Sequence, residues 1–199
     1  MTLKEEFIEL GYTEEDYEII RYSDAIITKK DETLIKKLKD SFTFFLDIGY
    51  TKEEVIKMTK KFPAIYGLSI ESMKQKIDDM INLGYSKEEV IKMTKTLPAI
   101  YGLSIENMKQ KIEFYDFIDM HELAVIDSKI LMQSVNLSYA RYSFYKDRGI
   151  DIDMNNYRKL FIGQKQFEKS YRIKKQELLE KYDYNKYKEE RKKENGRII

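Results

Sequence analysis

Cysteine is absent from the 199-residue sequence, and this absence excludes disulfide bonds, thiolate metal sites and thiol nucleophiles. Only two prolines and eight glycines are present. So few chain-breaking residues favour long uninterrupted elements over a turn-rich β architecture. With 42% hydrophobic and 13% aromatic residues, the chain is apolar enough to fold, which argues against intrinsic disorder.

Long hydrophobic runs are also missing. No stretch approaches the roughly 18 consecutive apolar residues of a membrane span, so we expect no membrane contact. Residues 1–7 are acidic and lack both the apolar core of a signal peptide and the arginines of a transit peptide. These observations predict a cytoplasmic protein.

Positive and negative charges nearly cancel over the whole chain, with 36 Lys/Arg against 35 Asp/Glu and a net charge of +1. Their distribution is uneven. Residues 1–140 carry 19 basic and 25 acidic side chains, a net charge of −6, whereas residues 141–199 carry 17 and 10, a net charge of +7. A basic C-terminal third of this kind attracts polyanions.

An internal duplication is the most informative feature. Residues 49–77 and 84–112 align without a gap over 29 positions, of which only four differ. The period of 35 residues is typical of helical solenoids, in which each unit packs only on its neighbours. We therefore predict an all-α solenoid, a single domain over residues 1–186. Its units are about 10–48, 49–83, 84–118 and a degenerate 119–186, and a frayed or disordered polar tail follows at 187–199.

Each central unit is predicted to hold two helices. Ser86 and Glu89 form a capping-box pattern at the start of the first helix, as Thr51 and Glu54 do one unit earlier. Pro98 ends that helix, because proline disfavours the α conformation in the residue before it. The second helix carries one apolar stripe at spacings of three and four residues, made by Ile105, Met108, Ile112 and Tyr115.

The repeated unit resembles that of the mTERF proteins, the mitochondrial transcription termination factor family. The resemblance rests on the Leu-Gly-Tyr-Ser run at 83–86 and on Leu97, Pro98, Ile100, Gly102 and Ser104. It is strong over residues 49–118, looser over 10–48 and faint around the Arg-Gly-Ile turn at 148–150. A short array rich in Lys, Ile, Tyr and Asn resembles a short, bacterial-type member.

This resemblance implies a left-handed α-solenoid with two α-helices and a short 3-10 turn per repeat. It also implies binding of nucleic acid along a basic concave face, DNA more often than RNA, without catalytic residues or cofactors. We therefore expect a protein that is not an enzyme and has no small-molecule substrate. It would contact the phosphate backbone through Lys and Arg and take part in transcription regulation.

Two sets of cations are candidate nucleic-acid contacts. The first recurs at a 35-residue spacing, so that a solenoid would align it as a ladder on one face, and comprises Lys57, Lys60, Lys92 and Lys95. The alternative is that Lys57 and Lys92 form i,i+4 pairs with Glu53 and Glu88 on a solvated helix surface.

The second set lies in the basic C-terminal third and comprises Arg141, Arg148, Arg158, Lys159 and Arg172, with Lys165, Lys174 and Lys175 nearby. Interleaved aromatic residues could stack on bases or riboses, namely Tyr142, Tyr145, Tyr157 and Tyr171. The alternative for these tyrosines is packing in the core, with the hydroxyl at its rim.

Other chemistry has little support. His121 is the only histidine, and without a second His or any Cys it cannot complete a metal site, so we interpret it as structural. We expect no catalytic residue, metal or cofactor. A second function stays open, because the near-neutral total charge and the short array also suit a protein-interaction module that uses the groove between repeats.

Overall fold

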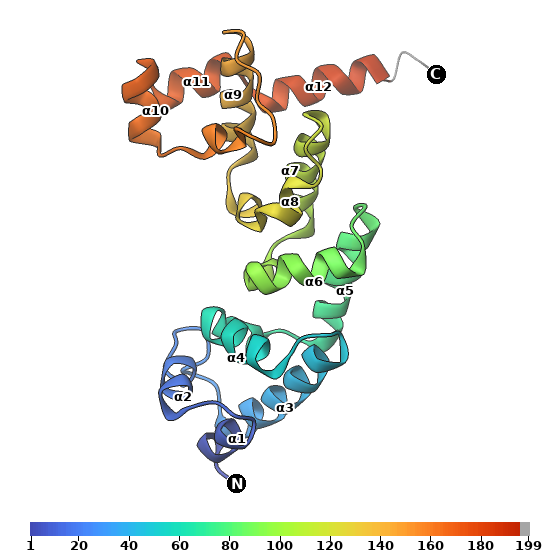
Figure 1. Ribbon diagram of the computed structural model, residues 1–199, viewed down its shortest axis with the longest axis vertical. Coiled ribbons are helices and arrows are strands. Elements are labelled where there is room, and N and C mark those ends of the chain that lie inside the picture. Colours follow the sequence, from blue (N-terminus) through green and yellow to red (C-terminus); the bar gives the residue numbers. More distant parts are fainter. Residues whose placement is uncertain (196–199) are drawn as a thin grey trace. The chain divides into compact units, whose positions relative to one another are not determined.

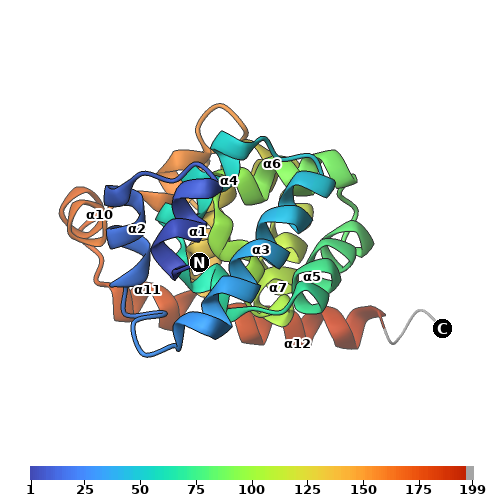
Figure 2. The same cartoon turned by 90° about the horizontal axis from the view of Figure 1, so that it is seen from below.

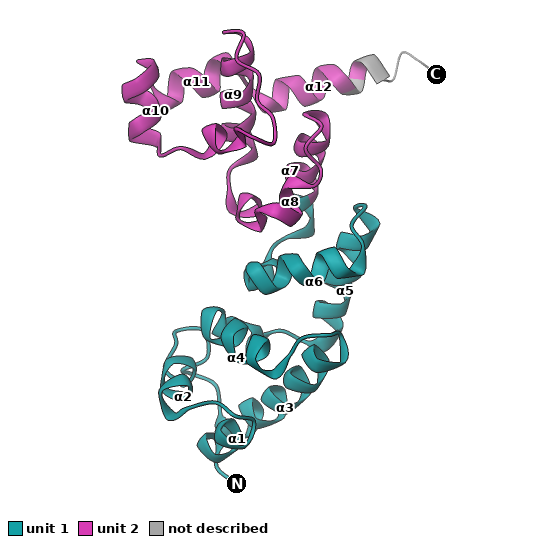
Figure 3. Cartoon of the chain, in the orientation of Figure 1, with its two compact units in different colours: residues 1–108 teal, residues 109–199 magenta. Residues whose placement is uncertain are grey.

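The computed structural model describes residues 1–195, which form helices and no strand (Figures 1 and 2). This confirms the predicted all-α class. The chain divides into two compact units, residues 1–108 and 109–199, with the boundary inside α7 (Ile105–Phe117) (Figure 3). The prediction of one domain over residues 1–186 did not include this division.

Unit 1 begins with α1 (Leu3–Glu9), α2 (Glu14–Arg21) and α3 (Asp31–Asp47). Two copies of one motif follow, each an α-helix, a 3-10 turn and a second α-helix. The first copy is α4 (Lys52–Lys61), η1 (Pro63–Gly67) and α5 (Ile70–Asn82). The second is α6 (Lys87–Thr96), η2 (Pro98–Gly102) and α7. The 35-residue sequence repeat is therefore a structural repeat, and it contains the 3-10 turn that the resemblance implied.

Unit 2 contains the C-terminal part of α7 and a shorter third copy of the motif, made by α8 (Leu123–Ile126), η3 (Ser128–Met132) and α9 (Val135–Lys146). The chain continues through η4 (Tyr157–Phe161), α10 (Gln164–Tyr171), α11 (Lys175–Lys181) and α12 (Tyr184–Asn195).

Helix α12 includes residues 187–195, for which the sequence predicted a frayed or disordered tail. The ring of Tyr187 stacks on that of Tyr139 with centroids 4.9 Å apart, and it also lies 5.0 Å from the ring of Phe117. A polar sequence is held as a helix here because two of its tyrosines, Tyr184 and Tyr187, meet aromatic rings of α7 and α9. Residues 196–199, the rest of the predicted tail, lie outside the described residues.

The local signals read from the sequence position these helices. The backbone N–H of Glu54 donates to the hydroxyl of Thr51 at 3.2 Å, and the N–H of Thr51 donates to the carboxylate of Glu54 at 2.9 Å. Ser86 and Glu89 form the same capping box on α6, which confirms both predicted boxes. Gly49 precedes α4 with a φ of 103°, a left-handed conformation that favours glycine.

The second helix of each repeat buries its predicted apolar stripe. Met108 and Ile112 of α7 have 0% and 1% of their surface exposed, and Met73 and Ile77 of α5 are also buried. The second helices α3 and α5 lie side by side (Figure 2). Within unit 1, neighbouring repeats are thus stabilised by burial against one another, as expected for a solenoid.

Buried hydroxyl groups join successive repeats of unit 1. The hydroxyl of Tyr12, in the turn before α2, lies 2.9 Å from that of Thr59 on α4 and 2.8 Å from that of Tyr66 on η1. Thr59 donates to the carbonyl of Val55 at 3.0 Å. Each hydroxyl has one proton, so all are satisfied when Tyr66 donates to Tyr12 and Tyr12 donates to Thr59.

One repeat later, the same arrangement recurs in Tyr50, Thr94 and Tyr101. The hydroxyl of Tyr50 lies 2.6 Å from that of Thr94 and 3.3 Å from that of Tyr101. Desolvation by burial raises the pKa of Tyr12, Tyr66 and Tyr101, so these phenols stay protonated and able to donate. Tyr66 and Tyr101 are therefore interface residues of the core.

Candidate nucleic-acid interface

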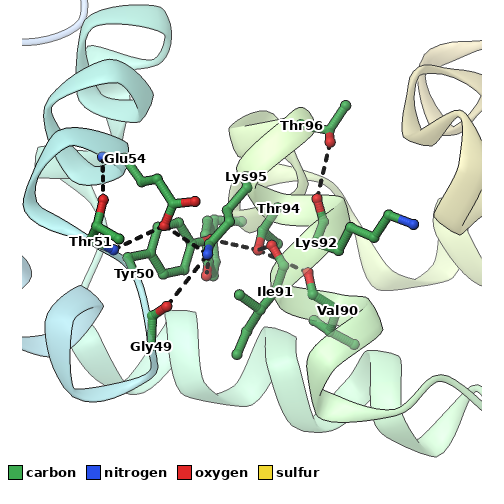
Figure 4. A network of polar contacts seen from close by, with 11 residues as sticks. Gly49, Tyr50, Thr51, Glu54, Val90, Ile91, Lys92, Thr94, Lys95 and Thr96 are labelled. Atoms are coloured by element: carbon green, nitrogen blue, oxygen red, sulfur yellow. Dashed lines mark hydrogen bonds and ion pairs between the residues drawn. The ribbon is translucent and has the colours of Figure 1, made fainter.

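Two of the four lysines in the predicted ladder are engaged between repeats. The ammonium of Lys95 lies 2.7 Å from the carboxylate of Glu54, 3.4 Å from the carbonyl of Gly49 and 5.1 Å from the ring centroid of Tyr50 (Figure 4). Lys60 makes the equivalent ion pair one repeat earlier, with Asp16 on α2, and its hydrogen bond holds the pKa of Asp16 below its usual value. These two lysines link neighbouring first helices, so only part of their charge faces solvent.

Lys57 and Lys92, the other two lysines of the ladder, are exposed. In Figure 4 the side chain of Lys92 points away from the network around Lys95. The alternative i,i+4 ion pairs with Glu53 and Glu88 are not formed in residues 1–195. Lys57 and Lys92 are thus available for contact, and their assignment to nucleic acid stays a prediction.

Arg141 was predicted as a surface contact, and its burial corrects this prediction. Only 2% of its surface is exposed. Its guanidinium donates to the carbonyls of Leu160 at 2.8 Å and Ile162 at 2.7 Å, and to the side chain of Gln164 at 3.1 Å. Because every one of these partners follows or ends η4, Arg141 fixes this segment on α9.

The contact made by Arg141 recurs in the two preceding repeats. In each of them, a cation on the second helix donates a hydrogen bond to a carbonyl near the end of the next 3-10 turn. Lys76 on α5 donates to the carbonyl of Leu103 at 2.7 Å, and Lys111 on α7 donates to that of Leu131. Lys76, Lys111 and Arg141 each lie eight residues before a residue with positive φ, at Gly84, Asp119 and Gly149. Burial lowers the pKa of Lys76 and of Lys111.

The strongest concentration of available positive charge lies in residues 158–175, here called the basic segment. It contains seven Lys/Arg and one acidic residue, Glu168. All seven cations are exposed, and they are Arg158, Lys159, Lys165, Lys169, Arg172, Lys174 and Lys175. Glu168 is half-buried. One of its carboxylate oxygens accepts hydrogen bonds from the backbone N–H of Lys175 at 3.0 Å and the amide of Gln164 at 3.0 Å, and the other forms an ion pair with Lys174 at 3.5 Å. The segment therefore presents nearly uncompensated positive charge.

Buried aromatic residues hold the basic segment in place. Phe167 on α10 is fully buried, with its ring centroid 5.3 Å from that of Phe144 on α9, and the guanidinium of Arg141 lies 4.7 Å from the Phe167 ring. Helix α10 consequently presents its polar face, including Lys165 and Lys169, to solvent. A packed apolar face and a charged outer face are what an amphipathic surface helix requires.

Arg172 ends α10 in the left-handed conformation, with a φ of 53°. This conformation costs a residue with a Cβ roughly 1–2 kcal/mol, and glycine is the usual choice at such a position. Arg172 is exposed and close in the sequence to Lys174 and Lys175, so it adds to the positive charge of this part of the chain.

The remaining candidates of the C-terminal set are distributed differently. Arg148 is exposed but lies outside the basic segment, with its guanidinium 3.5 Å from the ring centroid of Phe144. Tyr145 and Tyr157 are buried, and the hydroxyl of Tyr157 donates to Asp127 at 3.3 Å. Tyr171 packs its ring 4.8 Å from that of Phe167. The alternative interpretation, aromatic packing, describes these tyrosines.

No metal-binding group of His, Cys, Asp and Glu side chains occurs within residues 1–195. His121 lies 2.5 Å from the carboxylate of Asp116, a contact between residues of one turn. No helix in the same part of the chain is long and apolar enough to cross a membrane.

Sequence reasoning missed the cationic links from Lys76 and Lys111 and the tyrosine–threonine contacts. The recurrence of Tyr50 at Tyr85 and of Thr59 at Thr94 was the signal available for the second set. The sequence gives no comparable signal for the partner of Lys76. Its partner is a backbone carbonyl, which every residue has, so no residue type identifies it.

Comparison with known proteins agrees with this architecture. The sequence model of the mTERF family matches residues 5–82 and 25–122, together more than half of the chain. The chain belongs to the mTERF family. The two matches overlap, as expected for mTERF repeats that resemble one another. No curated protein matches the sequence. The mTERF match ends before the basic segment, so the charge at residues 158–175 is a feature of this chain outside the matched repeats.

Proposed function

We propose that this mTERF-family protein binds nucleic acid through the basic segment, with Lys and Arg contacting the phosphate backbone. The observation that supports this proposal is the row of seven exposed cations between Arg158 and Lys175, with one engaged carboxylate among them. Helical-repeat proteins of this family generally bind nucleic acid, which agrees with such a surface. The proposed ligand is DNA, and the proposed consequence is regulation of transcription.

The chemistry of the basic segment favours backbone contacts over base reading. Five of its seven cations are lysines, which act as point charges, whereas bidentate recognition of guanine favours arginine. Tyr157 and Phe167 are buried and offer no platform on which bases could stack, whereas Phe161 and Tyr171 are half-buried, with the ring of Tyr171 packed on that of Phe167. Affinity should therefore depend steeply on salt and weakly on sequence, because released counterions supply most of the binding free energy.

The test is fluorescence anisotropy with a labelled DNA duplex at several salt concentrations between about 50 and 200 mM. The double variant Lys165→Gln/Lys169→Gln removes two exposed cations of α10 that form no ion pair in the described part of the chain. We expect weaker binding at every salt concentration and a salt slope smaller by about 2, one for each lost phosphate contact.

The matched control is Lys36→Gln/Lys74→Gln, which removes two exposed lysines of α3 and α5 in unit 1. It should leave both the affinity and the slope unchanged. Equal losses in the two double variants would mean that binding reports net charge alone. The absence of any binding at the lowest salt concentration would refute the proposal and leave the fold unaffected.

A second candidate function, a protein-interaction module, is supported by a different observation. An apolar groove in unit 1 lies between α2 and α4, far in the sequence from the basic segment.

A further inference from the structure

Unit 1 has an apolar groove on the face formed by its first helices. The groove, here called the α2/α4 groove, has a volume of about 470 Å³ and is lined by Ile19, Glu53, Ile56, Lys57, Lys60 and Lys61. Ile19 on α2 leaves 44% of its surface exposed. Tyr22, one helical turn further along the chain, is 59% exposed. Within the groove the apolar contact surface is made by Ile19 and Ile56, which come from two different helices.

The rim of the α2/α4 groove is basic. Lys57 and Lys61 are exposed, and neither forms an ion pair within residues 1–195. Glu53 is the only acid that lines the groove, and it is drawn to the start of α4, where hydrogen bonds with its own backbone N–H and with Thr51 lower its pKa. Lys60 is already paired with Asp16. Glu15 on α2 also lies close enough to Lys60 to raise its pKa, so Glu15 and Glu53 contribute negative charge near the groove. Lys57 and Lys61 are the positive charges of its lining that remain without an ion pair in the described residues.

The combination of an apolar floor and a basic rim selects one class of ligand. A nucleic-acid backbone would satisfy Lys57 and Lys61, but its phosphates and sugars would leave Ile19 and Ile56 without apolar contact. A peptide helix with an apolar stripe would bury the isoleucines, and acidic residues beside the stripe would pair with the lysines. Helix-in-groove recognition uses this division of roles.

We infer that the α2/α4 groove is a docking site for an amphipathic helix of a partner protein, with apolar residues facing Ile19 and Ile56 and acidic residues facing Lys57 and Lys61. This site is separate from the basic segment: it lies in unit 1, whereas the basic segment lies in unit 2. In this site Lys57, one of the lysines of the predicted ladder, would contact an acidic residue of a partner protein and not a phosphate.

A similar hollow is present on α6, where it is lined in part by Ile91, Lys87 and Lys92. Ile91 and Lys92 are the repeat equivalents of Ile56 and Lys57, at a spacing of 35 residues. The hollow on α6 is also lined by Ile48, which is half-buried, whereas Ile19 in the α2/α4 groove is 44% exposed and offers more apolar surface to a partner.

The experiment uses the full chain and a fluorescein-labelled helical peptide that carries a leucine stripe flanked by glutamates. We expect saturable binding to the wild-type protein. Ile19→Ser should weaken this binding about tenfold, since it removes apolar area from the centre of the contact. Lys57→Glu should weaken it about three- to tenfold, because a rim attraction becomes a repulsion. Both positions are solvent-exposed, so the variants should retain the wild-type melting temperature.

Matched control variants distinguish binding in the groove from non-specific electrostatic or hydrophobic binding elsewhere on the protein. Ile81→Ser on α5 replaces an isoleucine that is 39% exposed, and Lys74→Glu makes the same charge reversal away from the groove. Both should bind the peptide as the wild type does. A second peptide, with serines in place of the leucines, should not bind.

Three results would overturn the inference. One is the absence of peptide binding. Another is equal affinity of the wild type and Ile19→Ser. The third is displacement of the peptide by duplex DNA together with a loss of DNA binding in Lys57→Glu, which would assign the groove to nucleic acid. The salt-dependence test at Lys165 and Lys169 is independent of all three, so failure of either proposal leaves the other intact.

Discussion

The hydroxyls of Tyr12 and Tyr66 lie 2.8 Å apart in the buried interface between the first two repeats of unit 1. Tyr12 belongs to the turn before one first helix, and Tyr66 belongs to the 3-10 turn of the next repeat. The hydroxyl of Thr59 completes a chain of three side chains that ends on a backbone carbonyl. Two bulky phenols can be buried there because each polar oxygen has a partner.

Removing one member of this chain should destabilise unit 1. In Tyr12→Phe, the hydroxyls of Thr59 and Tyr66 each lose a buried partner, and we expect a loss of about 1–3 kcal/mol in the free energy of unfolding. Urea unfolding measures it. The double variant Tyr12→Phe/Thr59→Val removes both groups, so its loss should be smaller than the sum of the two single losses. Additive losses would show that the two hydroxyls do not interact.

The same tyrosines predict a decline in stability at alkaline pH. Burial raises the pKa of Tyr12, Tyr66 and Tyr101 above the value of 10.0 for a free phenol. The folded state therefore holds these protons more tightly than the unfolded state. Their contribution to stability is complete below about pH 10 and is lost as the pH rises toward the folded-state pKa values.

Melting temperatures measured from about pH 8 to about pH 11 test this dependence on tyrosine ionisation. The double variant Tyr12→Phe/Tyr50→Phe should start less stable and lose less stability over this range. A loss as steep as that of the wild type would assign the decline to other groups, such as Lys60, whose pKa is raised by its hydrogen bond with Asp16.

Arg141 should act on stability and on the position of the basic segment. Arg141→Gln leaves the carbonyls of Leu160 and Ile162 without a charged donor, which should cost about 2–3 kcal/mol. Arg141→Lys should cost less, because Lys76 and Lys111 make the equivalent contact in the two preceding repeats. Thermal unfolding gives the comparison.

DNA binding by the Arg141→Gln variant, measured at a temperature at which it stays folded, provides the second measurement. The salt slope should equal that of the wild type, since a side chain that is 2% exposed makes no phosphate contact. A slope reduced by about 1 would contradict the structural role of Arg141.

Two substitutions of Arg172, which has a left-handed backbone conformation, should have the same effect on DNA binding but different effects on stability. Arg172→Gly and Arg172→Ala both remove one exposed cation, so both should weaken DNA binding equally. Only glycine relieves the left-handed conformation, at a φ of 53°, so Arg172→Gly should be more stable than Arg172→Ala by about 1 kcal/mol. Equal stabilities would show that α10 ends differently in solution.

The features that could be predicted from the sequence are those that depend on residues close together in the chain. Capping boxes at Thr51 and Ser86, the end of a helix before Pro98 and the apolar stripe through Ile112 depend on residues within one turn or one helix. A duplicated sequence also repeats these signals, which reveals the unit and its length. The two-helix repeat and the all-α class were therefore predictable.

The candidate site was harder to predict, because a charged residue has the same letter whether it is buried or exposed. Lys92 and Lys95 lie on one helix of one repeat, yet Lys92 is exposed while Lys95 contacts Glu54 across the repeat interface. Arg141 and Arg158 belong to one basic stretch, yet only Arg158 is exposed.

By itself, the sequence of this protein determined the two-helix repeat, its length and the sign of the charge in each part of the chain, since these follow from local propensity and from counting residues. Tertiary structure alone decided which cations remain free. An ion pair such as Lys60 with Asp16, or a carbonyl that receives Arg141, exists only when residues far apart in the chain are packed together. Packing leaves the seven cations of the basic segment exposed in unit 2 and leaves Ile19 exposed beside Lys57 in unit 1.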